Sequence, residues 1–230
     1  DHSLDPGAVA GLIKGEGIMG QVLNSQLDVD RMDYLLRDSH YTGVAYGLIE
    51  PLRLIGEISA RGQILLVNQK GLPAAEQLLV SRYLMYPAVY YHHVSRIAAS
   101  MFIKSFREMI NDGRITPYEM MAMDDYEAVA ILKSSKGFSK DMIERILSRR
   151  LFKRALYIGI DSLGRRYEQD QQEDLENEIA VLSDIDPCEV IVDFPRNPSA
   201  EESKTNVLYE DEIKPLIEVS SLVSTLEDAQ

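Results

Sequence analysis

The sequence predicts a mainly α-helical protein with one short β-hairpin and a small α+β part near its C-terminal end. Two observations carry this prediction. Apolar residues recur in steps of three and four over much of the first ~160 residues, which is the spacing of a buried helix face. After Gly164 the composition changes to a strongly acidic stretch, followed by short β-branched runs separated by proline and polar residues.

The first half contains two long helical segments with a strand between them. Residues 5–43 begin with an acidic residue and a proline, as helix starts often do, and a turn ends them. Residues 61–71 place leucine and β-branched residues between two glycines, which is typical of one strand of a hairpin. A helical segment over 73–111 follows, and Pro87 is expected to kink it because proline lacks a backbone donor.

Shorter elements are predicted for the remainder. Residues 116–135 and 139–159 read as helices that each begin at a Thr or Ser able to cap them. An acidic helix is predicted over 165–186, a strand over 189–195 and a loop over 197–205. A further strand over 206–209 and a helix over 213–223 follow. We therefore expect a helical core in residues 1–165 and a small α+β appendage in residues 166–230.

Composition limits the classes of function. The formal net charge is -13, from 37 acidic and 24 basic residues, so the surface should repel extended nucleic acid but can still hold a local basic pocket for one nucleotide. No apolar run approaches the ~20 residues that span a bilayer, so no membrane partner is expected. Cys188 is the single cysteine, which suits a reducing compartment and predicts a cytoplasmic protein.

The stretch LDVDRMDYLLRDSHYTGVAYG is the first candidate site. On a helix, Met32, Leu35 and Leu36 fill one arc, and the opposite arc holds Asp30, Arg31, Asp33, Tyr34, Arg37 and Asp38. Four aspartates between positions 28 and 38 are unexpected on a solvated helix, because Asp is a mediocre helix former. Short carboxylates suit a metal ion or a ligand hydroxyl, and a ladder of ion pairs such as Asp33 with Arg37 is the structural alternative.

A second candidate lies in SRYLMYPAVYYHH. Arg82, Tyr86, Tyr90 and His93 recur at helical spacing and share a face, so a guanidinium and aromatic rings can converge on one ligand. The alternative is that the tyrosines fill the core beside the apolar stripe.

Both segments resemble motifs of the HD-domain deoxynucleoside triphosphate triphosphohydrolases, the family of the vertebrate sterile-alpha-motif enzyme. The resemblance implies part of an HD-domain-type helical bundle, homo-oligomeric assembly, and hydrolysis of a deoxynucleoside triphosphate to deoxynucleoside and triphosphate. It implies that Asp30, the second Asp of DVD, is a catalytic residue and ligates a divalent metal ion (Mg, Mn, Zn, Fe, Ni or Co). Arg31 is implied to face the phosphates as a second catalytic residue, with Tyr34 and Asp38 beside the sugar and Asp38 near its 3′-hydroxyl.

The same resemblance extends to the second segment. It implies that Arg82 lies against the phosphates and Tyr90 near the base, while Tyr86 stands where the vertebrate enzyme has a histidine. The stretch SRRLFKRALYIG is similar to a late Arg-Leu-Phe-Lys helix of the family.

The family also needs a His and an adjacent His-Asp pair as metal ligands. This sequence has no His-Asp dipeptide, and its four histidines are His2, His40, His92 and His93. We therefore expect the C-terminal portion of such an enzyme without the upstream ligands, inactive as an isolated chain. The alternatives are a non-catalytic nucleotide-binding or oligomerisation module and an HD phosphohydrolase for another phosphoester.

Overall fold

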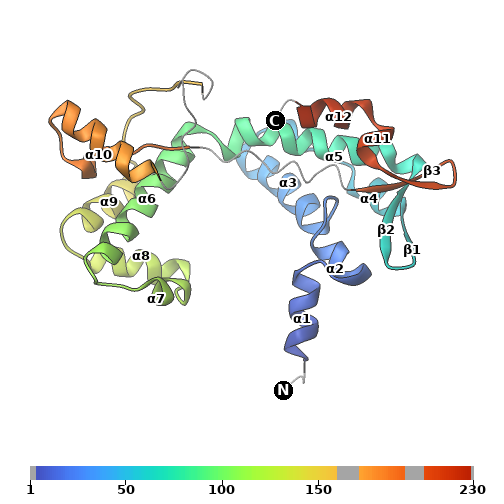
Figure 1. Cartoon of the computed structure of the whole chain (residues 1–230), viewed down its shortest axis with the longest axis horizontal. Coiled ribbons are helices and arrows are strands. Elements are labelled where there is room, and N and C mark those ends of the chain that lie inside the picture. The colour runs from blue at the N-terminus through green and yellow to red at the C-terminus, as the bar shows by residue number, and fades with distance from the viewer. Residues whose placement is uncertain (1–3, 160–170, 195–204, 229–230) are drawn as a thin grey trace. The chain divides into compact units, whose positions relative to one another are not determined.

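The protein is mainly α-helical and contains one four-stranded sheet, as the sequence predicts (Figure 1). The computed structural model describes residues 4–159, 171–194 and 205–228. The predicted boundary between the helical core and the appendage falls within residues 160–170, which lie outside the described residues.

The chain forms two compact units. One combines Asp1–Tyr90 with Asn197–Gln230, and the other is Tyr91–Arg196. Residues 205–228 thus belong to the first unit and residues 171–194 to the second.

Helices make up most of the first unit. They are α1 (Pro6–Ile13), α2 (Gly17–Leu23), α3 (Val29–Thr42), η1 (Ala45–Gly47), α4 (Pro51–Gly56), η2 (Gln69–Gly71), α5 (Leu72–Met85), the π-helix η3 (Tyr86–Tyr90), α11 (Leu216–Val219) and α12 (Ser221–Asp228). The predicted break near Pro87 is confirmed, because the long helical segment changes there from α5 to a π-helix. The predicted end of the first helical segment at Gly43 is also confirmed, since Gly43 follows α3 in the left-handed conformation with φ of 72°; residues 40–42, predicted as part of the turn, are still helical.

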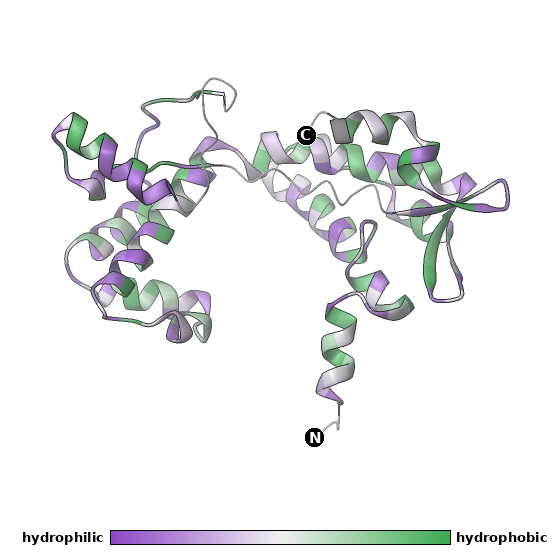
Figure 2. Cartoon of the chain, in the orientation of Figure 1, coloured by the Kyte–Doolittle hydropathy of each residue, from purple (hydrophilic) through white to green (hydrophobic). Residues whose placement is uncertain are grey.

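The sheet joins parts of the chain that are far apart in sequence. Its strands are β1 (Ile58–Arg61), β2 (Ile64–Asn68), β3 (Asn206–Tyr209) and β4 (Glu212–Pro215), hydrogen-bonded in that order. β1 and β2 form the predicted antiparallel hairpin, and β3 pairs with β4 in the same way. β2 and β3 are parallel, with Val67 opposite Val207. Figure 2 shows β2 as strongly hydrophobic, and its Leu66 and Val67 are buried.

α5 lies at the centre of the core of the first unit. Leu78 and Leu79 on α5 are almost fully buried, and α3 contributes Leu35 to the same cluster. Val207 from β3 and Leu216 from α11 complete it from the C-terminal part of the chain. The burial of these apolar residues fixes α3 beside α5, which are the two helices that carry the candidate site.

The second unit has its own core. Its elements are α6 (His93–Asn111), α7 (Pro117–Met121), α8 (Asp125–Ser134), α9 (Phe138–Leu147), α10 (Gln172–Ser183) and η6 (Pro187–Glu189). Phe106 and Met109 of α6 pack with Leu132 of α8 and Ile143 of α9. The acidic residues in the first turns of α8 and α10 suit the positive end of the helix dipole.

Three predicted elements of this unit differ in the structure. The helix predicted over 116–135 is divided into α7 and α8, because Asp124 caps a second helix start. The helix predicted over 139–159 ends at Leu147, and Arg149 follows with φ of 57°, which a helix cannot continue through. The strand predicted over 189–195 does not form in its described residues, because Glu189 ends η6 and residues 190–194 are irregular. Side chains occupy its backbone groups instead: Lys104 donates to the carbonyl of Val190, and the backbone N–H of Val192 donates to Glu176.

Gly47 allows η1 to approach α3 closely. Its backbone N–H donates to Ser39 Oγ at 2.9 Å, and a Cβ on Gly47 would lie 2.5 Å from both that Oγ and the carbonyl oxygen of Leu35. Gly47→Ala is therefore expected to lower the free energy of unfolding by about 1–3 kcal/mol through overpacking. Gly56→Ala is the matched control, because nothing lies within 4 Å of its added Cβ. Urea unfolding of the two variants measures this, and equal stabilities would contradict the described contact.

No helix in the described parts of the chain is both long and apolar enough to cross a membrane.

Candidate functional site

α3 presents the first half of the candidate site. Asp28 caps the helix, because its carboxylate accepts from the backbone N–H of Arg31 at 2.7 Å and from that of Ser25 at 3.1 Å. Met32, Leu35 and Ser39 are buried along one side of α3. Arg31, Tyr34 and Asp38, three and four residues apart, lie together on a partly buried face.

α5 and the π-helix η3 present the second half. Arg82, in the last turn of α5, is only 8% exposed, although it carries a charge. Its Nη2 donates to the hydroxyl of Tyr86 at 3.0 Å, and its Cζ lies 5.0 Å from the centroid of the Tyr86 ring. A buried guanidinium against an aromatic face is held in one orientation, which suits it for recognising a ligand.

The two halves meet through tyrosines. The hydroxyl of Tyr90 donates to Asp38 Oδ2 at 2.9 Å across a separation of 52 residues. The Tyr90 ring lies edge-on to Tyr34 at a centroid distance of 6.1 Å and edge-on to Tyr86 at 5.3 Å. The structure thus brings together six of the seven site residues that the resemblance implies, namely Arg31, Tyr34, Asp38, Arg82, Tyr86 and Tyr90.

Two arginines give this cluster its electrostatic character. The pKa of Arg31 is lowered, first by burial and then by the nearby charge of Arg82, while Asp28 opposes the shift. Arg31 is oriented by Gln26, to which its Nη1 donates at 3.1 Å (backbone oxygen) and 3.0 Å (Oε1), and its Nε lies 3.7 Å from Asp28 Oδ2. Two guanidinium groups that repel each other are stabilised by a bound anion such as phosphate.

Tyr34 and Tyr90 have raised pKa values. Burial is the main cause for both; a hydrogen bond from Arg82 partly offsets it at Tyr34, and the Asp38 carboxylate adds to it at Tyr90. Because the folded protein favours the protonated phenols, they contribute stability that is complete below the unfolded pKa of about 10 and is lost as the pH rises above it.

Tyr90→Phe is therefore expected to make the loss of stability above pH ~10 shallower and to remove one late-ionising tyrosine from the ultraviolet titration. Urea midpoints measured across the alkaline range, together with the titration at the tyrosinate band, check both effects. Loss of a tyrosine that ionises in the ordinary range near pH 10 would contradict the part-buried hydrogen bond to Asp38.

Asp30 differs from the other aspartates of the motif. Asp28 caps α3, Asp33 forms an exposed ion pair with Arg37 at 2.5 Å, and Asp38 accepts from Tyr90. The ion pair between Asp33 and Arg37 confirms the structural alternative for those two residues. Asp30 is exposed in the first turn of α3 and makes no hydrogen bond or ion pair with any described residue. Among the four aspartates of this motif, Asp30 is the one whose carboxylate has no partner among the described residues.

The described residues do not by themselves fit a catalytic metal ion. No group of three or more His, Cys, Asp or Glu side chains in residues 4–159, 171–194 and 205–228 is arranged to hold one. Asp30 can supply one oxygen ligand, and a divalent ion needs several. Any tightly bound metal therefore requires ligands beyond those that the structure describes.

Gln26 and the capping role of Asp28 were not predicted from the sequence. The role of Asp28 could have been detected, because Asp is a preferred N-cap residue and its side chain accepts a hydrogen bond from the backbone N–H three positions later, here that of Arg31. Gln26 precedes the helix, and no periodic pattern identifies it as the partner of Arg31.

The chain matches the family model described as "HD associated region" over residues 49–230. It is 30% identical to an uncharacterized protein of Methanocaldococcus jannaschii over 224 residues, which cover 94% of this chain and 49% of that protein. It is 29% identical to the uncharacterized protein YwfO of Bacillus subtilis over 154 residues, or 57% of this chain and 36% of that protein. The chain thus spans about half the length, or less, of these relatives.

Two solved structures share the fold. One is described as a phosphohydrolase from Bacteroides thetaiotaomicron, with a TM-score of 0.67 and 23% identity, covering 97% of this chain and 64% of that one. The other is a hypothetical protein from Aquifex aeolicus, with a TM-score of 0.66 and 22% identity, covering 97% and 60%. At these identities the likeness shows the fold alone.

Proposed function

Because the chain belongs to the family described as the HD associated region, we propose that it forms the nucleotide-binding side of an HD-type phosphohydrolase that acts on deoxynucleoside triphosphates. The observation that carries the proposal is the pair of mutually repelling arginines, Arg31 and Arg82, set against three tyrosines. Such a cluster offers charge for phosphates and aromatic faces for a base or sugar.

Each side chain has a role in this proposal. Arg31 and Arg82 bind the phosphates and offset the negative charge that develops on them during hydrolysis. Tyr34 and Asp38 lie beside the deoxyribose, with Asp38 near the 3′-hydroxyl and held in place by Tyr90. Tyr86 and Tyr90 line the side toward the base. Water adds to the α-phosphorus, the bond to the 5′-oxygen breaks, and that oxygen takes up a proton, which yields deoxynucleoside and triphosphate.

The metal ion belongs to the complete protein in this proposal. Here the complete protein means a chain as long as the relatives. The M. jannaschii protein, for example, is about twice as long as this chain. Asp30 contributes one ligand, and the remaining ligands come from outside the described residues. The choice among Mg, Mn, Zn, Fe, Ni and Co, and assembly as a homo-oligomer, are part of the same proposal and rest on resemblance alone.

Product analysis tests the proposed reaction. The complete protein, supplied with divalent metal, is expected to convert a deoxynucleoside triphosphate into equimolar deoxynucleoside and triphosphate. The isolated 230-residue chain is expected to release neither, because one carboxylate holds a catalytic ion too weakly. Release of inorganic phosphate from other phosphoesters, without triphosphate formation, would indicate a different HD phosphohydrolase. Metal-dependent triphosphate release by the isolated chain would refute the division of ligands.

A further inference from the structure

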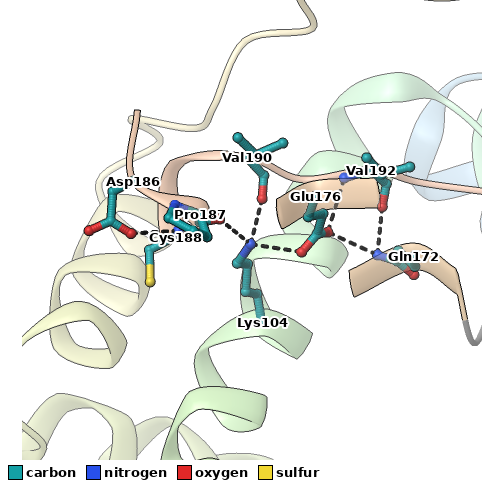
Figure 3. Close-up of polar contacts among 8 residues, drawn as sticks. All are labelled: Lys104, Gln172, Glu176, Asp186, Pro187, Cys188, Val190 and Val192. Carbon is teal, nitrogen blue, oxygen red and sulfur yellow. Dashed lines mark hydrogen bonds and ion pairs between the residues drawn. The ribbon is translucent and has the colours of Figure 1, made fainter. Parts of the chain in front are cut away.

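Residues 171–194 in the second unit form a segment that we call the strap. It consists of α10, the short helix η6 and the irregular stretch Val190–Phe194 that returns beside α10. The strap lies against α6, where a buried ion pair attaches it (Figure 3).

Lys104, a buried cation of α6, bonds to both parts of the strap: the helix α10, which we call the helical arm, and residues 187–194, which we call the returning arm. Lys104 is 6% exposed, and its Nζ donates to Glu176 Oε2 at 2.8 Å in the helical arm. The same Nζ donates to the carbonyl oxygens of Pro187 at 2.7 Å and Val190 at 2.5 Å in the returning arm. These three acceptors use all three donors of the ammonium group.

Glu176 completes the network from the side of the strap. It is 3% exposed, and its Oε1 accepts from the backbone N–H of Val192 at 3.0 Å and from Gln172 Nε2 at 3.2 Å. Gln172 Nε2 also donates to the carbonyl of Val192 at 2.5 Å. The strap is therefore closed on itself by polar contacts and meets α6 at Lys104, as Figure 3 shows.

The strap buries the apolar side chains of Ala180 and Val190, but it adds none to the main apolar core of this unit. The hydrophobic cluster of the second unit, built from α6, α8, α9 and their connections, includes no residue of the strap among those described. Val181 and Leu182 of α10 are 80% and 79% exposed. A second ion pair to α6, Arg96 with Asp193, is partly exposed and so is weakened by solvent and salt.

We propose that the strap is a releasable element, latched to α6 by the ion pair of Lys104 with Glu176, and that it opens as one unit while the core of α6, α8 and α9 stays folded. A buried ion pair with every hydrogen bond satisfied holds as long as both partners are present. It fails when one partner is lost, because the other charge is then buried without compensation. Segments that contribute little to an apolar core are those that open locally.

Hydrogen exchange measured by mass spectrometry on the full 230-residue chain tests this proposal. In the unmodified chain, amides of α10 are expected to be less protected than those of α6, α8 and α9. In Lys104→Met, exchange across residues 172–192 is expected to accelerate by roughly 10- to 100-fold, with α8 and α9 changed by less than about threefold. Lys140→Met is the matched control, since its ion pair with Glu144 is half-exposed and spans 3.9 Å.

The double variant Lys104→Met with Glu176→Leu distinguishes a latch from general damage to the fold. Removing both charges is expected to restore part of the lost protection, because no unpaired charge is left buried, although the carbonyls of Pro187 and Val190 and the N–H of Val192 lose their side-chain partners. Two results would overturn the proposal: unchanged exchange of the strap in Lys104→Met, or acceleration that is equal in the strap, α8 and α9. Failure of the double variant to recover protection would count against the ion pair as the latch.

Discussion

Asp30→Ala in the complete protein is expected to reduce turnover of a deoxynucleoside triphosphate by more than about a hundredfold and to lower the bound metal. Loss of residues that merely orient metal ligands typically costs 10- to 100-fold, and we propose that Asp30 is a ligand itself. Its side chain is exposed and makes no hydrogen bond or ion pair with the described residues, so the fold should tolerate the substitution. Metal analysis and steady-state kinetics measure the two effects.

Asp33→Ala is the matched control on the same helix. Asp33 is also exposed, but its carboxylate pairs with Arg37, and exposed pairs of this type contribute about 0.3–0.5 kcal/mol. Turnover and metal content are expected to stay near those of the unmodified protein. Unchanged metal content in Asp30→Ala, or an equal loss of turnover in both variants, would argue against Asp30 as a ligand.

Arg82→Ala is expected to weaken triphosphate recognition by about 10- to 100-fold, which corresponds to the loss of a hydrogen bond to a charged group. The effect should appear in the dissociation constants of the deoxynucleoside triphosphate and of inorganic triphosphate, and much less in that of the deoxynucleoside. Calorimetry or competition binding with the three ligands separates these contributions. Arg82 is buried and donates to Tyr86, so the substitution can also lower stability. Thermal unfolding of the variant therefore has to show that it is folded under the conditions of the binding measurement.

Arg37→Ala serves as the charge-matched control, since Arg37 is exposed on α3 and pairs with Asp33. Arg82→Lys retains the charge but lacks the planar fork, and it is expected to recover only part of the affinity. If Arg82→Ala and Arg37→Ala lose equal affinity, the effect is one of overall charge, and the assignment of Arg82 to the phosphates fails.

Local patterns predicted much of the first unit. The hairpin, the end of α3 at Gly43 and the break near Pro87 each depend on residues that are neighbours in sequence. The convergence of α3 with α5 and η3 was predictable in part, because helical spacing gives each segment one polar face with a defined set of side chains.

Contacts between distant residues could not be predicted in this way. The parallel pairing of β2 with β3 joins positions 67 and 207, and neither strand carries a signal for its partner. Lys104 and Glu176 are 72 residues apart, and each resembles an ordinary surface charge in the sequence. That contact also explains why residues 190–194 are not the predicted strand, since side chains occupy the backbone groups that a sheet would need.

A crystal structure of the complete protein with Mn²⁺ and a non-hydrolysable deoxynucleoside triphosphate analogue tests the central proposal most directly. The proposal predicts phosphate oxygens within hydrogen-bonding distance of Arg31 and Arg82, the sugar beside Tyr34 and Asp38, and the carboxylate of Asp30 on the metal ion. A nucleotide bound elsewhere, with Asp30 facing solvent and no ion beside it, would contradict it.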